Sequence, residues 1–182
     1  MDSDEELFRQ VAAGQTERLG ELVERYQRQL HSLALRLMHR RPEAEDAVQE
    51  TFLRALRFRH QFREGSKVRP WLYQICLNLC RDQLRKRSRH PESDLEDLVV
   101  ADPARGPEEQ SLQKLTAERV RQAVSALPDK HREVFILVQY QNMSYLEAAE
   151  VMGVPVGTIK SRMFHASAKL AEALKDLRQV QS

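Results

Sequence analysis

The chain has 182 residues, of which 41% are apolar and 31% are charged, and its net charge is only +2. This length allows one ordinary domain or two small ones, and the near-neutral charge excludes a broadly basic chain. The sequence has no apolar run near the ~20 residues of a membrane span, and its first residues are acidic where a secretory signal would be basic, so we expect a cytoplasmic protein.

Charge is uneven along the chain. Residues 1–90 hold 18 basic and 13 acidic residues, residues 91–113 hold 1 and 7, and residues 114–182 hold 10 and 7. The acidic middle part also carries three prolines and no useful helical period. We therefore predict an all-α protein of two small helical domains, joined by a flexible acidic linker over 91–113.

Apolar residues at helical spacing predict the first three helices, near 5–13, 17–40 and 42–59. Pro42 suits the opening of the third. The outer face of this third helix has acidic residues first and basic residues last, which matches the helix dipole. That face is either simply solvated or a docking surface for a partner. Its candidate docking residues are Asp46, Gln49, Glu50 and Arg54.

A loop over 60–69 mixes aromatic and basic residues, and Pro70 opens a helix to about Arg87. Aromatic rings such as Phe62 and Trp71 can stack on unpaired bases at ~1–3 kcal/mol per base, while Lys and Arg neutralise phosphates. The alternative is that these rings are core residues flanked by surface charge, and the local pattern alone favours it. The helix ends in a basic cluster suited to a phosphate backbone.

The two cysteines, Cys76 and Cys80, lie four residues apart on this predicted helix. Such a pair does not make a disulfide scaffold, and it indicates buried thiols in a reducing compartment. A metal or redox pair is the less favoured alternative, because no other cysteine exists and no histidine follows at ligand spacing. We expect no metal site and no cofactor.

A helix-turn-helix is predicted over 144–170, within the second domain, 114–182. Ser144 and Glu147 form a capping box, Gly153 permits the positive φ of a sharp helix end, and Pro155 suits the start of the next helix. That helix has an apolar stripe opposite a polar face that can reach phosphates and base edges. The stripe is Ile159, Met163, Ala166 and Leu170. The alternative is an ordinary helical hairpin.

Four segments in order resemble the extracytoplasmic-function sigma factors of bacterial RNA polymerase. They are AEDAVQETFLRAL (44–56), VRPWLYQICLNLCRDQLRKRSR (68–89), LPDKHREVFILV (127–138) and MSYLEAAEVMGVPVGTIKSR (143–162). The second is similar to the family pattern Trp-Leu-x-x-Ile-x-x-Asn-x-x-x-Asp, at Trp71, Leu72, Ile75, Asn78 and Asp82.

The resemblance implies a factor that binds core RNA polymerase and promoter DNA and is controlled by an anti-sigma factor. The first domain would dock on the polymerase and capture the minus-10 element as single strand. The second would read the minus-35 element as duplex. The implied minus-10 residues are Phe62, Arg63, Lys67, Trp71, Asn78, Arg81 and Arg85. The implied minus-35 residues are Thr158, Lys160, Ser161, Arg162, Phe164 and His165.

The chain departs from the family at His165 and Ser167, where a basic residue is usual. Fewer phosphate contacts predict weak binding by the isolated second domain and a shallow salt dependence. A free imidazole titrates near ~6.5, so the charge of His165 would be partial near neutral pH.

Two other function classes compete with this interpretation: a free-standing helix-turn-helix regulator, and an adaptor that binds only proteins. The docking helix and the aromatic-basic loop over 44–89 disfavour the regulator. The six histidines are scattered among unlike elements, and no phosphate cradle is present, so we expect no enzymatic activity.

Overall fold

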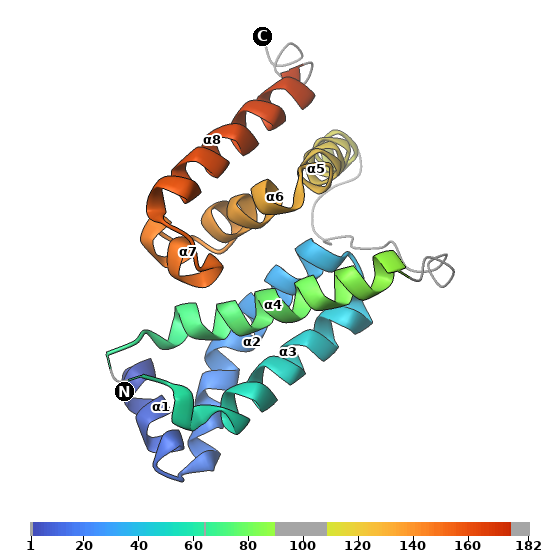
Figure 1. Ribbon diagram of the computed structural model, residues 1–182. Helices are drawn as coiled ribbons and strands as arrows, with labels where there is room; N and C mark the ends of the chain where they lie inside the picture. The colour runs from blue at the N-terminus through green and yellow to red at the C-terminus, as the bar shows by residue number, and fades with distance from the viewer. Residues whose placement is uncertain (1, 64, 90–108, 176–182) are drawn as a thin grey trace.

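The structure is a computed structural model, and it describes residues 2–63, 65–89 and 109–175. Every regular element within those ranges is helical, which confirms the all-α prediction (Figure 1). Of the helices described, none combines the length and apolar character that a membrane crossing requires. The predicted linker lies largely outside the described residues.

The first group of helices forms one apolar core. Ser3 caps its first helix by accepting a hydrogen bond from the Glu6 N–H at 3.1 Å. His39 ends the second helix in the left-handed conformation, at φ 60°, so the chain reverses into the third. The helices are α1 (Asp4–Ala12), α2 (Leu19–Met38), α3 (Arg41–Arg57) and α4 (Val68–Arg89), with short turns η1 (Thr16–Arg18) and η2 (Arg59–Gln61).

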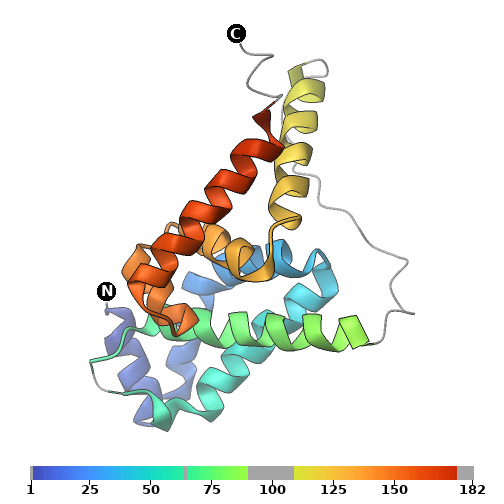
Figure 2. The same cartoon turned by 45° about the horizontal axis from the view of Figure 1, so that its top comes forward.

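The second group contains the helix-turn-helix. Its elements are α5 (Glu109–Ser125), α6 (Asp129–Phe135), the π-helical turn η4 (Ile136–Tyr140), α7 (Tyr145–Met152) and α8 (Val156–Ala173). The helix α5 begins at Glu109, ahead of the domain start expected at residue 114. It packs against α8 (Figure 2).

The two groups of helices pack directly against each other. The helix α7 lies on α4 (Figures 1 and 2). The element η4 also contacts α2. This contact explains why α4 is buried on two sides. Apolar spacing predicts one buried stripe on this helix, formed by Leu72, Ile75, Cys76 and Leu79. Three of these residues are buried and Ile75 is half-buried, while Tyr73 and Leu77 are fully buried in addition.

Candidate nucleic-acid interface

The helix-turn-helix is built by local hydrogen bonds. The Ser144 hydroxyl accepts from the Glu147 N–H at 3.2 Å, and the Glu147 carboxylate accepts from the Ser144 N–H at 2.9 Å. Gly153 ends α7 at φ 64°, and Pro155 precedes the first residue of α8. The capping box, the left-handed glycine and the two helices are therefore confirmed.

The recognition helix α8 separates its apolar and polar residues as predicted. All four residues of the apolar stripe are buried. On the remaining surface Lys160, Ser161 and His165 are exposed, Thr158 and Arg162 are half-buried, and Phe164 is 71% exposed. This face can offer donors to phosphates and base edges and a ring to a thymine methyl. Contact of these six residues with DNA stays a prediction.

A histidine that the sequence analysis did not select joins this surface. His131 of α6 stacks on His165 of α8, with ring centroids 5.8 Å apart and planes inclined by 21°. Phe164 meets the same His165 ring edge-on at 5.6 Å. Periodicity could not reveal this contact, because the two histidines are on different helices.

Phe62 and Trp71 form an aromatic cluster with Phe8 of α1. The centroid distances are 4.9 Å from Phe8 to each ring and 5.2 Å between Phe62 and Trp71. Phe8 is fully buried, while the other two rings are half-buried. The rings thus stabilise the packing of α1 on α4 and also keep part of their surface open. Stacking on unpaired bases stays a prediction.

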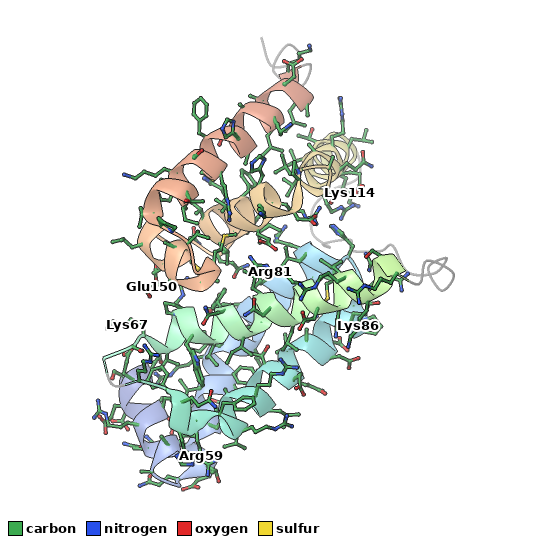
Figure 3. All side chains as sticks on the ribbon, viewed as in Figure 1. Arg59, Lys67, Arg81, Lys86, Lys114 and Glu150 are labelled. Carbon is green, nitrogen blue, oxygen red and sulfur yellow. The ribbon has the colours of Figure 1, made fainter. Side chains whose placement is uncertain are left out.

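The polar candidates of the first domain do not all face the same way. Arg63 and Lys67 are exposed in the loop before α4, and Asn78 and Arg85 are exposed on α4 (Figure 3 labels Lys67). Arg81 lies instead between α4 and the second group of helices, as Figure 3 shows. In this arrangement its guanidinium is engaged within the protein.

Arg81 forms a two-point ion pair with Glu133 of α6. Its Nε and Nη2 atoms lie 2.8 and 2.7 Å from the two carboxylate oxygens. The Glu133 side chain is only 8% exposed, and that of Arg81 is 32% exposed. The hydrogen bonds to Glu133 raise the pKa of Arg81 above its ordinary value. Such paired, planar contacts are the strong form of a charged hydrogen bond.

A second polar contact between the two groups of helices, besides the Arg81–Glu133 ion pair, lies at the start of α4. Arg69 donates to the Glu147 carboxylate at 2.8 Å and to the Gln141 carbonyl oxygen at 2.6 Å. The Tyr73 hydroxyl donates to Gln141 Oε1 at 3.0 Å, and burial raises the pKa of Tyr73 to about 12. Burial alone would raise the pKa of Glu147, but hydrogen bonds from Ser144 and the charge of Arg69 lower it. Both contacts hold α4 against the helix-turn-helix domain.

The predicted docking face of α3 is open to solvent. Asp46 and Gln49 are exposed, and Glu50 accepts a hydrogen bond from Arg54 Nε at 2.8 Å. Leu53 was not selected from the sequence, but it is 55% exposed on this face, four residues after Gln49. Docking of polymerase on this face stays a prediction.

Cys76 and Cys80 are free and buried, as predicted. Within the described residues, no group of three or more His, Cys, Asp or Glu side chains is placed to hold a metal ion.

Comparison with known families agrees with this two-part architecture. Residues 22–90 match the family model of sigma-70 region 2, and residues 117–170 match that of sigma-70 region 4. Together these matches cover more than half of the chain and define a sigma-70-type transcription initiation factor.

Individual relatives show to which group of sigma factors the chain belongs. The chain is 37% identical over 173 residues to the ECF RNA polymerase sigma factor SigM of Mycobacterium tuberculosis, covering 94% of this chain and 85% of SigM. It is 31% identical over 180 residues to the ECF RNA polymerase sigma factor SigW of Bacillus subtilis, covering 93% of this chain and 96% of SigW. The chain therefore belongs to the extracytoplasmic-function (ECF) sigma factors, which bind core RNA polymerase and promoter DNA.

Two solved structures resemble most of the chain. CnrH, in complex with the cytosolic domain of CnrY, superposes with a TM-score of 0.75 at 28% identity, over 96% of this chain and 99% of CnrH. The sigma factor RpoE of Bartonella quintana, in complex with the anti-sigma factor NepR, superposes with a TM-score of 0.70 at 31% identity. This match covers 86% of this chain and 96% of RpoE.

Proposed function

We propose that this chain directs core RNA polymerase to its promoters in the cytoplasm by reading the minus-35 element as duplex through α8. The observation that carries this proposal is the composition of the polar face of α8. It combines two cations (Lys160 and Arg162), two hydroxyls (Thr158 and Ser161), His165 and the widely exposed Phe164, whereas the apolar stripe of the helix is buried. A ring 71% exposed to water gains from contact with a thymine methyl, and the cations gain from phosphate or guanine.

The first domain has two tasks in this proposal. The half-buried rings of Phe62 and Trp71 stack on bases of the separated minus-10 strand, while Arg63 and Lys67 neutralise its phosphates. The open face of α3 binds the polymerase, with Leu53 supplying apolar contact among polar neighbours.

Reading both elements requires the two domains to separate. The names of the elements set them ~25 base pairs apart, which is ~85 Å at ~3.4 Å per base pair. In the structure α4 and α7 are in contact, and Arg81 is paired with Glu133. We therefore infer that the arrangement described here is a closed form, and that polymerase binding favours an open one.

An anti-sigma factor is the proposed regulator. Two chains that superpose on this one, CnrH and RpoE, were each solved with a protein partner. We infer that a similar partner binds this chain in its closed form, because a ligand shifts an equilibrium toward the state that it binds better.

Transcription from a fragment library with purified core polymerase, with and without the chain, tests the function. Factor-dependent transcripts that share two upstream elements would support the proposal. Replacing both Lys160 and Arg162 with Gln should abolish them while polymerase binding persists. Lys175→Gln, just beyond the C-terminal end of α8, is the matched control and should leave the transcripts intact. Duplex binding without any factor-dependent transcript would instead identify a free-standing regulator.

A further inference from the structure

The stacked pair His131 and His165 lies within a cationic strip. Arg162, His165 and Lys169 fall three and four residues apart on α8, so they share one face of the helix. His131 reaches this face from α6 and covers one side of the His165 ring. Four groups that carry or can take up positive charge are thus gathered beside the proposed duplex-reading surface.

The charges around His131 disfavour its protonation in the free chain. Burial lowers the pKa of His131, and the positive charges of His165, Lys169 and Arg162 lower it further. Its Nδ1 atom is buried and has no hydrogen-bond partner among the described side chains.

Most of the carboxylates on the neighbouring helices pair with other groups, and Glu150 of α7 is exposed to solvent. On α6, Asp129 is bonded to Arg132 at 2.7 Å, and Glu133 of the same helix pairs with Arg81. On α7, Glu147 pairs with Arg69, and on α5, Glu118 pairs with Arg121. The element η4, which also packs on α6, has tyrosine as its one ionisable residue, and Tyr140 lies under the Arg36 guanidinium.

We propose that His131 is a positioning residue for His165, and that the stacked pair takes up a proton when α8 binds duplex DNA. The inference rests on the proposed minus-35 function. Stacking holds the His165 ring in one orientation, so less conformational freedom is lost on binding. A DNA phosphate supplies the negative charge that the free strip lacks, and a protonated imidazole donates hydrogen bonds from both ring nitrogens.

The sign of the pH dependence follows directly. The complex binds a proton that the free chain does not hold, so duplex affinity rises as pH falls. Uptake of one proton gives a rise of at most about tenfold per pH unit. A chain with permanent cations at this place would show no such slope.

Duplex binding by the full chain, followed by fluorescence anisotropy between about pH 6 and about pH 8, tests the proposal. The probe is a labelled duplex of arbitrary sequence at about 50 mM salt, because phosphate contact does not depend on sequence. Wild type should bind several-fold more tightly at the lower pH. His131→Phe keeps a flat ring but cannot take up a proton. Its duplex affinity should therefore depend much less on pH than that of wild type. His165→Arg should bind duplex more tightly than wild type at the higher pH, and most of the pH dependence of its affinity should be lost.

His31→Gln is the matched control, since His31 lies on α2, which carries none of the proposed DNA-contacting residues, and it should keep the wild-type slope. His131→Gln serves as a second variant, and thermal melts confirm that each protein is folded. Equal slopes in wild type and His131→Phe would overturn the inference, as would duplex binding by wild type with no slope. No duplex binding by any variant would overturn the inference alone, because the proposed function is tested by transcription with core polymerase present.

Discussion

Removing the charge of Glu133 should loosen the closed arrangement. In Glu133→Gln the side chain keeps its volume and one acceptor, but one of the two bonds to Arg81 and the ionic attraction are lost. A hydrogen bond to a charged group contributes ~1.5–3 kcal/mol, and water screens part of it because the Arg81 side chain is 32% exposed. We expect ~2 kcal/mol, or about a 30-fold shift of the equilibrium between closed and open forms.

Energy transfer between dyes on the two domains measures this shift. Cysteines introduced at the exposed positions Gln27 and Ala171 would carry the dyes, because Cys76 and Cys80 are buried and should react slowly. Asp129→Asn is the matched control: its carboxylate is bonded to Arg132 of the same helix and does not cross between domains. Unchanged transfer in a folded Glu133→Gln protein would refute the role of this ion pair.

The remaining predictions concern the two reading surfaces. Replacing Lys160 or Arg162 singly with Gln should lower the slope of log affinity against log salt by about 1, measured by duplex titration. Trp71→Ala should weaken strand opening more than duplex capture in permanganate footprinting; an equal loss of both in a protein with an unchanged melt would contradict its stacking role. Gly153→Ala should destabilise the second domain by ~1 kcal/mol in a thermal melt, because its φ of 64° disfavours a side chain; an unchanged melting temperature would show that the turn relaxes.

Local signals predicted the helix-turn-helix well. The capping box at Ser144, the glycine at 153 and the stripe of α8 are set by neighbours within a few positions, and the structure has all three. The same holds for the polar face of α8, because its exposure follows from the burial of the opposite side.

Features that depend on domain docking could not be predicted. The sequence indicated one apolar stripe on α4, but Tyr73 and Leu77 are also buried, because α7 covers a second side of the helix. The pairing of Arg81 with Glu133 could not be predicted for the same reason, and contact of Arg81 with the minus-10 strand stays a prediction. The burial of the Glu133 carboxylate depends on its ion pair with Arg81, which is 52 residues away in the sequence.

The double role of Glu147 has a kinetic consequence. Its carboxylate caps α7 through Ser144 and also binds Arg69 on the other domain. When the domains part, the cap remains and only side-chain contacts break, so no helix must melt and reform. Separation should therefore proceed on the microsecond-to-millisecond scale of domain motions, faster than a refolding step, and each newly freed helix-turn-helix is ready to scan DNA at once.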